Sequence, residues 1–563
     1  MTERNLMQLL VDKNKLLGLK KQSNQVVSLT LSDRQLCDLE LILNGGFHPL
    51  NGFLNKEDYE SVLTSMRLTS RDLWPIPINL DISEKTSEMI SIGDDIALRD
   101  KEGFALAIMH VVAKWKPDKD KEAQNIFRTT DILHPGVNYL QNKSRSIYLG
   151  GPVTGLRLPK HYNYQSLRMT PEDVKNKFME LGWEKVVAFQ TRNPMHRAHV
   201  EITRQAAKEH GASLLIHPVV GMTNPGDFNY FTRVRCYKKI IEKYPDETAM
   251  LSLLPLAMRM AGPREALWHA IIRKNYGCTH LIIGRDHAGP GKDSQGNPFY
   301  GPYDAQKLLK EHEEEISVTM VPFKMMVYVK EKEKYLAVDE VSNHLTKLEV
   351  SGSELKRRLD KDLDIPEWFS YSDVLEELRK SRPPLDKRGF TILFTGLSGS
   401  GKSTLANGLL NRLLEIGSRP VTLLDGDVVR IHLSSELGFS KEHRSINVKR
   451  IGFVASEITK NCGIAICAPI APYSADRRAA REMVSVYGGF IEVYVSTPLE
   501  VCERRDVKGL YEKARKGIVK EFTGISDPYE IPESPEIVID SSAEDPEILV
   551  KNIVEKIKEF GYM

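Results

Sequence analysis

The sequence lacks several features that would place it in a specialised class of protein. No apolar run approaches the roughly 18 residues that a membrane-spanning helix needs, and the N-terminal MTERNLMQLLVDKNK is too polar for a secretory signal. The six cysteines show no CxxC spacing, so we expect no disulfide framework and a reducing, cytoplasmic location. The formal net charge of +2 favours no nucleic-acid partner. What remains is an ordinary globular composition, with 41% apolar and 27% charged residues among 563.

The pattern of strands and helices divides the chain into four segments. At roughly 150 residues per domain, a chain of this length predicts three or four domains. Residues 1–165 are strand-rich, with runs such as DIALRD (95–100), and residues 166–345 alternate apolar strands with helices. Residues 346–385 form a small, charged helical segment and a proline-containing linker, and 386–563 form a second α/β domain. The predicted fold class is therefore α/β multidomain, with two parallel sheets after a β-rich N-terminal domain.

A phosphate-binding motif lies at the start of the last segment. Residues 396–403 match GxxxxGK[ST], after an apolar run at 391–395 and before a helical pattern that ends at Gly417. Glycines let backbone N–H groups surround phosphates at a helix N-terminus, where Lys402 reaches the β- and γ-phosphates and Ser403 binds Mg²⁺. The predicted ATP-binding residues of this domain are Gly396, Ser398, Gly399, Ser400, Gly401, Lys402, Ser403 and Thr404.

Carboxylates and cations follow the motif and are candidates for the acceptor site. Asp425 and Asp427 end the next strand, where a carboxylate can orient Mg²⁺ or accept a hydroxyl proton, although a solvated turn is the alternative. A second anion could be bound by Arg430, Arg444 and Asn447. The alternative is that each of them is an ordinary surface residue.

This segment resembles the adenylyl-sulfate kinases over about 386–560. The resemblance is carried by FTGLSGSGKST, LDGDVVR, KGLYEKARKG and EFTGISDPYE. It implies a P-loop kinase domain in which Asp427 is the base for the 3′-hydroxyl of adenylyl sulfate. It also implies that Phe439 and Phe522 stack on the adenine of adenylyl sulfate. The full set of implied substrate contacts is Asp425, Arg430, Phe439, Arg444, Asn447, Ile470, Lys508 and Phe522. Ala471 stands where many members have a serine, which excludes a phosphoserine there.

A second anion-binding pattern follows the strand KVVAF (185–189). Asn193 is a candidate N-cap and Pro194 suits the first helical position, which would place His196 and His199 on one face of the first turns. Two imidazoles there can donate to phosphate oxygens, and Arg192 adds an anion clamp. The alternatives are ordinary surface or core histidines, or a zinc site, for which no convincing third ligand is nearby.

The first 385 residues resemble the ATP sulfurylases. The resembling segments are GGFHPLNGF, QTRNPMHRAH, GMTNPGDFNYFTRVR, GRDHAGPG and VPFKMMVY. The resemblance implies a PUA-like N-terminal domain and a Rossmann-like nucleotidyltransferase domain. It implies catalytic Thr191, Arg192 and Asn193, transition-state stabilisation by His196 and His199, and sulfate contacts from Gln190, Arg192 and Ala288. ATP contacts are implied for residues 190–193 and for Gly284, Arg285, Asp286 and His287. Phe323 stands where the family has a residue that moves on ATP binding, and Met326 stands at the next contact position, where Val is frequent.

Together the two resemblances imply a bifunctional enzyme of sulfate activation. Its expected partners are ATP, sulfate, adenylyl sulfate and pyrophosphate, with Mg²⁺ accompanying ATP, in a homo-oligomer without nucleic acid or membrane. The main alternative is a regulatory C-terminal domain, as in fungal sulfurylases whose phosphate loop has degenerated, but Lys402, Ser403 and Asp427 favour catalysis here. A nucleotide-gated scaffold and a sulfurylase running in reverse to make ATP are further alternatives.

Overall fold

The computed structural model describes residues 9–223, 227–323, 325–342, 344–506, 509–542 and 544–563. The chain forms two compact units: unit 1 comprises Met1–Val350 and Ile365–Leu378, and unit 2 comprises Ser351–Asp364 and Arg379–Met563. The segment 346–385 is therefore shared between the units. No helix of the described residues has the length and apolarity of a membrane span.

The N-terminal part of unit 1 is a seven-stranded sheet. Its order is β1-β4-β5-β7-β2, and β3 and β6 also pair with β7. The strands are β1 (Val27–Thr30), β2 (Gly52–Phe53), β3 (Leu80–Ile82), β4 (Asp95–Arg99), β5 (Ala105–His110), β6 (Ala113–Trp115) and β7 (Ile147–Gly155). The helices are α1 (Lys13–Ser23), α2 (Asp33–Leu43), α3 (Lys56–Ser65), α4 (Glu84–Ser87), α5 (Lys119–Phe127) and α6 (Pro135–Asn142). Glycine at position 151 of β7 is required, because a Cβ there would lie 1.9 Å from the carbonyl oxygen of His110.

The second part of unit 1 is a parallel five-stranded sheet of order β10-β9-β8-β11-β12. The strands are β8 (Val186–Phe189), β9 (Ser213–Ile216), β10 (Ala249–Leu251), β11 (His280–Ile283) and β12 (Thr319–Pro322). The helices are α7 (Pro171–Glu180), α8 (Arg197–His210), α9 (Tyr230–Ile241), α10 (Gly262–Asn275), α11 (Asp304–Glu311) and α12 (Glu313–Ile316). Because β8 and β11 are parallel neighbours, the loops that follow them emerge at the same edge of the sheet.

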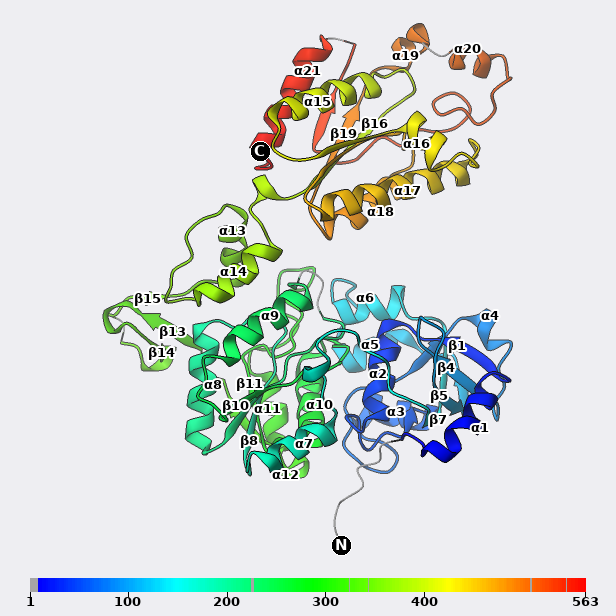
Figure 1. Ribbon diagram of the computed structural model, residues 1–563. Coiled ribbons are helices and arrows are strands. Elements are labelled where there is room, and N and C mark those ends of the chain that lie inside the picture. The colour runs from blue at the N-terminus through cyan, green and yellow to red at the C-terminus, as the bar shows by residue number, and fades with distance from the viewer. Residues whose placement is uncertain (1–8, 224–226, 324, 343, 507–508, 543) are drawn as a thin grey trace. The chain divides into compact units, whose positions relative to one another are not determined.

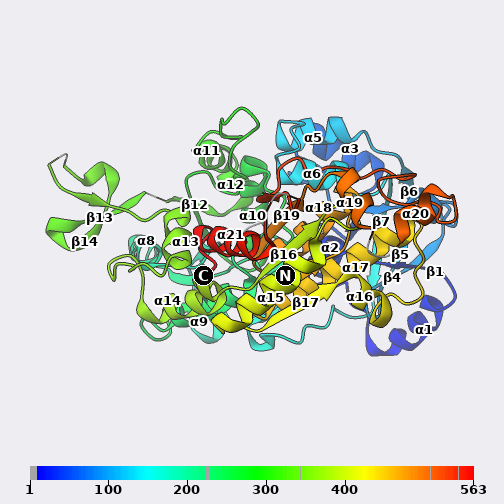
Figure 2. The same ribbon diagram turned by 90° about the horizontal axis from the view of Figure 1, so that it is seen from above.

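A small sheet extends from this domain, and Figure 2 shows its β13–β14 hairpin projecting beyond the helices of the parallel sheet. It has the order β14-β13-β15, with β13 (Met326–Val329), β14 (Lys334–Ala337) and β15 (Lys347–Leu348). Helix α14 (Ser372–Ser381) begins in the segment that returns to unit 1, which ends at Leu378.

Two features anchor the core of unit 1. The ring of Phe47 packs against Trp74 and Trp268, with centroid distances of 5.6 and 5.1 Å. Asp38 and Arg259, each with a side chain only 2% exposed, form an ion pair of 2.6 Å between α2 and the segment before α10. The pair is also tied into a backbone network, because Arg259 and Ala261 donate backbone N–H groups to Glu265.

Unit 2 is a parallel sheet covered on both faces. Its order is β17-β18-β16-β19-β20, with β16 (Phe390–Thr395), β17 (Val421–Asp425), β18 (Ile464–Ala468), β19 (Gly489–Val495) and β20 (Ile537–Ile539). Helices α15 (Lys402–Ile416) and α21 (Pro546–Glu559) cover one face, and α17 (Lys441–Lys460) and α18 (Ser474–Ser485) cover the other (Figure 1). The remaining helices are α13 (Gly352–Asp360), α16 (Gly426–His432), α19 (Leu499–Arg505) and α20 (Leu510–Arg515). The central strand β16 is buried throughout, as its mainly apolar sequence predicts.

Candidate active sites

The loop after β8 enters its helix later than the sequence predicts. The N-cap of α8 is His196, so the prediction that Asn193 caps this helix is wrong. The hydroxyl of Thr191 accepts the backbone N–H of Asn193 at 3.1 Å, and Tyr237 of α9 donates to the Asn193 carbonyl at 2.8 Å. These contacts hold Asn193 in a turn, and the helix begins only at Arg197.

The two histidines of the motif are neutral and have defined ring orientations. The backbone N–H of His196 donates to Nδ1 of His199 at 3.1 Å, so the ring proton of His199 must lie on Nε2. Nδ1 of His196 lies 2.9 Å from the hydroxyl of Ser370. Burial lowers the pKa of His196 to about 3, helped by the nearby His199, and lowers the pKa of His199 to about 4. Both rings can therefore donate hydrogen bonds at neutral pH without carrying charge.

Arg192 is held in place by a carboxylate. Its Nη1 lies 2.7 and 2.8 Å from the two oxygens of Asp227, and the two side chains are 21% and 12% exposed. Burial raises the pKa of Asp286 in the loop after β11, and the charges of Arg192 and Arg285 oppose that rise. The structure therefore brings the loops after β8 and β11 within electrostatic reach of one another, as the two predicted sets of residues require.

The loop after β11 has an unusual backbone. Asp286 and Ala288 both adopt left-handed conformations, with φ of 53° and 54°. The N–H of Asp286 donates to the Pro302 carbonyl at 2.9 Å, and the Ala288 carbonyl accepts the N–H of Gly262 at 3.3 Å. Gly284 precedes them directly after β11. Such strain is typical of loops that present backbone groups to ligands.

A buried histidine that sequence reasoning missed joins these two loops. His269 of α10 is fully buried, with Nε2 3.4 Å from the Gln190 amide nitrogen and Nδ1 3.0 Å from Nε2 of His287. Its Nε2 also lies 3.4 Å from the buried carboxylate of Glu265. Oε1 of Gln190 has no hydrogen-bond partner within the described chain. The sequence of α10 offers little signal for this role, because the helix buries other polar residues as well, namely Glu265, Arg273 and Asn275.

The last two predicted sulfurylase residues, Phe323 and Met326, lie after β12. Phe323 follows β12, and its N–H donates to the Ile283 carbonyl at 2.9 Å, beside Gly284. Met326 begins β13 of the small sheet, and its contact with the nucleotide stays a prediction.

The phosphate loop of unit 2 has the predicted strand–loop–helix form between β16 and α15. Three of its glycines have positive φ, namely Gly396 (152°), Gly399 (73°) and Gly401 (98°). A Cβ at Gly396 would lie 2.6 Å from the Val495 carbonyl oxygen, so only glycine fits there. Nζ of Lys402 donates to the Leu397 carbonyl at 2.6 Å. Ser398, Ser400 and Thr404 lie in or beside the loop, and the carbonyl of Ser400 accepts hydrogen bonds from Thr497 and Ser541.

Two oxygen-bearing side chains meet beside the loop. The hydroxyl of Ser403 donates to Asp425 at 2.8 Å, and the other oxygen of Asp425 accepts the backbone N–H of Asp427 at 3.0 Å, which caps α16. A hydroxyl and a carboxylate are hard oxygen donors of the kind that Mg²⁺ prefers. The chemistry of this pair therefore fits a magnesium ion, and Asp427 lies exposed next to it.

The predicted adenylyl-sulfate residues are partly engaged with the chain itself. Arg444 donates to the Thr523 hydroxyl at 2.6 Å and to the carboxylate of Asp527, which also accepts from Tyr473 at 2.9 Å. Nε of Arg444 and Oδ1 of Asn447 are buried and have no partner among the described residues. The Nε–H of Arg444 fits an anionic group of a substrate, and the amide oxygen of Asn447 fits a substrate group that donates a hydrogen bond.

The remaining predicted residues of this site surround the same region. Arg430 lies over the ring of Phe439, with its guanidinium carbon 4.3 Å from the ring centroid, and Phe439 is 67% exposed. Phe522 is buried and packs against Tyr511, and the stacking of the two phenylalanines on adenine stays a prediction. The Ile470 carbonyl accepts from the Thr395 hydroxyl at 2.8 Å at the start of the phosphate loop. Lys508 lies outside the described residues.

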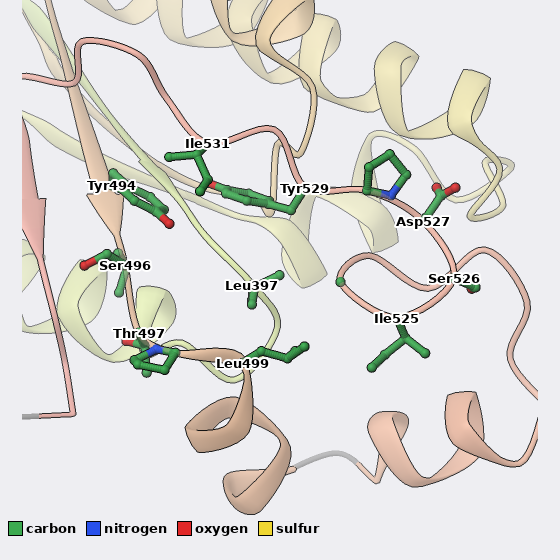
Figure 3. Close-up of a pocket in the computed structure, with 14 residues that line it drawn as sticks. Leu397, Tyr494, Ser496, Thr497, Leu499, Ile525, Ser526, Asp527, Tyr529 and Ile531 are labelled. Atoms are coloured by element: carbon green, nitrogen blue, oxygen red, sulfur yellow. The ribbon is translucent and has the colours of Figure 1, made fainter.

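A cavity of about 540 Å³ lies beside the phosphate loop. Figure 3 shows Tyr494 and Tyr529 on one side, Leu499 and Ile525 on the other, and Leu397 between them. The cavity shares Leu397 with the phosphate loop and Asp527 with the Arg444 ion pair, but none of the residues predicted to bind ATP or adenylyl sulfate line it.

The two sites and their sheets define an ATP-dependent transferase with two separate nucleotide-binding domains. Known families match each part: a PUA-like domain at residues 2–158, ATP-sulfurylase at 165–381 and adenylylsulphate kinase at 388–540. The chain belongs to the sulfate adenylyltransferase family. It is an enzyme that combines a sulfate adenylyltransferase with an adenylyl-sulfate kinase domain, and the predicted fold class is confirmed.

Relatives match nearly the whole chain. The sulfate adenylyltransferase of Phaeosphaeria nodorum is 50% identical over 96% of this chain and 95% of its own length. That of Chaetomium globosum is 49% identical over 97% of this chain and 96% of its own length. Among solved structures, a hexameric APS kinase from Thiobacillus denitrificans is 38% identical and covers 99% of this chain and 97% of its own, with a TM-score of 0.79.

Proposed function

We propose that this enzyme activates sulfate in two successive steps. Unit 1 joins sulfate to the α-phosphate of ATP, giving adenylyl sulfate and pyrophosphate, and unit 2 then transfers a second phosphoryl group to the 3′-hydroxyl of adenylyl sulfate. The observation that carries the proposal is the presence in one chain of two neutral, oriented histidines and an intact phosphate loop with the Ser403–Asp425 pair.

The first step needs positioning and charge stabilisation, because sulfate is already deprotonated and requires no general base. A sulfate oxygen attacks the α-phosphorus, a new P–O bond forms, and the bond to the β-phosphate oxygen breaks. Arg192, held by Asp227, orients the sulfate. The Nε2–H groups of His196 and His199 donate to phosphate oxygens as charge moves onto the leaving pyrophosphate.

In the second step the γ-phosphoryl group of ATP passes to the 3′-oxygen. Backbone N–H groups of the phosphate loop and Lys402 bind the β- and γ-phosphates. Asp427 accepts the hydroxyl proton as the new P–O bond forms and ADP leaves. Mg²⁺, held by Ser403 and Asp425, would neutralise charge on the phosphate oxygens. The intact loop favours catalysis over a purely regulatory kinase-like domain.

A coupled assay tests both steps on the full chain. The enzyme is incubated with sulfate, MgATP and pyrophosphatase, and the nucleotide products are separated by ion-exchange chromatography. We expect 3′-phosphoadenylyl sulfate from the wild type, adenylyl sulfate alone from Asp427→Asn, and neither product from His199→Asn. If the wild type stops at adenylyl sulfate, and supplied adenylyl sulfate is not phosphorylated either, the C-terminal domain is regulatory and the second half of the proposal fails.

We further propose that the enzyme is a cytoplasmic homo-oligomer. All six cysteines lie within the described chain and are free thiols, which suits a reducing compartment. The similar Thiobacillus denitrificans protein is described as hexameric. Light scattering coupled to size-exclusion chromatography should give a mass that is a multiple of 63.8 kDa, and a monomeric mass would contradict the oligomer.

A further inference from the structure

We propose that Ser370 is a positioning residue for the sulfurylase reaction: its hydroxyl donates to Nδ1 of His196 and keeps the ring proton on Nε2, where it can serve the phosphates of ATP. The inference rests on the proposed role of His196. It extends the sulfurylase site to a side chain 174 residues further along the chain, which is not among the site residues that the motif or the resemblance implies.

The contact is short and lies inside the protein. Oγ of Ser370 lies 2.9 Å from Nδ1 of His196, and the two residues are 1% and 7% exposed. The ring of Phe369 packs on the imidazole, with centroids 4.4 Å apart. Ser370 and Phe369 both pack against the buried ring, and Ser370 supplies the hydrogen-bond partner of Nδ1.

The chemistry of the substrate decides which group donates. Phosphate oxygens that carry no proton only accept, so His196 must present an N–H to them. A neutral imidazole has a single N–H, and if it lies on Nε2 then Nδ1 must accept. The hydroxyl of Ser370 is then the donor, as a histidine's second partner commonly sets its tautomer. His199 has the same arrangement, with the backbone N–H of His196 in place of the hydroxyl.

The backbone around Ser370 is held firmly enough to perform this role. The backbone carbonyl groups of the three residues before Ser370 each accept a hydrogen bond from another part of unit 1. The Arg197 Nε donates to Glu367 (2.7 Å), the Tyr335 hydroxyl to Trp368 (2.7 Å), and the Arg197 backbone N–H to Phe369 (3.2 Å). Arg197 directly follows His196, so the residue that begins α8 also fixes the position of the serine. The guanidinium carbon of Arg197 lies 4.2 Å from the centroid of the Tyr371 ring, which adds a further contact.

The test compares Ser370→Ala with a hydroxyl-retaining variant and a matched control. Ser372 is exposed two residues further on, so Ser372→Ala controls for a serine-to-alanine change in this segment. We expect Ser370→Ala to lower kcat for adenylyl sulfate formation about tenfold, because one buried hydrogen bond is lost. The KM values for ATP and sulfate should stay within threefold of the wild-type values. Ser370→Thr should keep most of the activity, and Ser372→Ala all of it. Phosphorylation of supplied adenylyl sulfate should not change in any of them.

A double-mutant cycle separates positioning from general structural support. In a His196→Ala background, Ser370→Ala should change kcat less than twofold, because the group through which it acts is gone. A further tenfold fall would overturn the proposal, as would a Ser370→Ala enzyme as active as Ser372→Ala, or a Ser370→Thr enzyme as impaired as Ser370→Ala. If Ser370→Ala does not fold, Ser370→Cys, which keeps the volume but donates weakly, takes its place in the cycle. Failure of the wild type to make adenylyl sulfate would instead refute the proposed function itself.

Discussion

His199 has a structural contact and a proposed catalytic role that substitution can separate. Its Nδ1 accepts the N–H of the N-cap residue, which supports the start of α8, while its Nε2–H is left for substrate. In asparagine, Oδ1 occupies the place of Nδ1, but no donor reaches the place of Nε2. His199→Asn should therefore keep the helix start and lose the catalytic donor, whereas His199→Ala should lose both. A missing cap interaction costs about 1 kcal/mol, and a missing transition-state donor costs about 10²–10³ in kcat.

The two effects are measured on the same proteins. All tryptophans lie in unit 1, at positions 74, 115, 183, 268 and 368, so their fluorescence during urea unfolding follows that unit alone. We expect His199→Ala to lose about 1 kcal/mol of unfolding free energy and His199→Asn to stay within about half of that loss. Because burial holds the pKa of His199 near 4, the wild-type kcat should show no titration of this group between pH 6 and 9. A His199→Asn enzyme with more than a third of wild-type activity would refute the assignment of Nε2 as a catalytic donor.

Three other changes test the fold and the second site. Asp38→Ala leaves Arg259 buried without its carboxylate and should cost about 3–5 kcal/mol of unit 1 stability; a loss below 1 kcal/mol in urea would contradict this. Burial lowers the pKa of His134 to about 4, so the unfolded state binds its proton first and stability should fall as pH drops from 6.5 towards 4, by about 3 kcal/mol. His134→Asn should flatten that pH dependence, and an unchanged slope would be evidence against it. Gly396→Ala places a Cβ against the Val495 carbonyl and should abolish phosphorylation of adenylyl sulfate without affecting its synthesis, a separation that product analysis detects.

The phosphate loop could be predicted because its structure is determined locally. The hydrophobic segment that becomes β16, the glycines with positive φ and the helix capped by Gly417 are contiguous, and each follows from short-range sterics. The same holds for β8 and β11, whose buried runs mark the centre of a parallel sheet.

The helix start at residue 197 could not be predicted in the same way. Asparagine is a favoured N-cap residue, but the hydroxyl of Tyr237, 44 residues away, donates to the Asn193 carbonyl and holds it in a turn. Asparagine preferences describe an isolated helix end, and this tertiary hydrogen bond overrides them. Arg444 is a comparable case, since a residue expected to bind substrate already contacts Asp527 and Thr523 of its own domain.

The two active sites share one architecture but differ in where their polar groups come from. Each places a helix N-terminus after a central parallel strand, where backbone donors and the helix dipole favour anions. In unit 2 most of the groups predicted to bind phosphate belong to the loop itself. In unit 1, His196 contacts Ser370 and Gln190 contacts His269, and these two partners lie 174 and 79 residues away along the chain and are not themselves predicted to bind substrate. Substitutions of His269 or Ser370 should therefore impair adenylyl sulfate synthesis without direct contact with substrate, whereas substitutions that impair the kinase should cluster close to its motif.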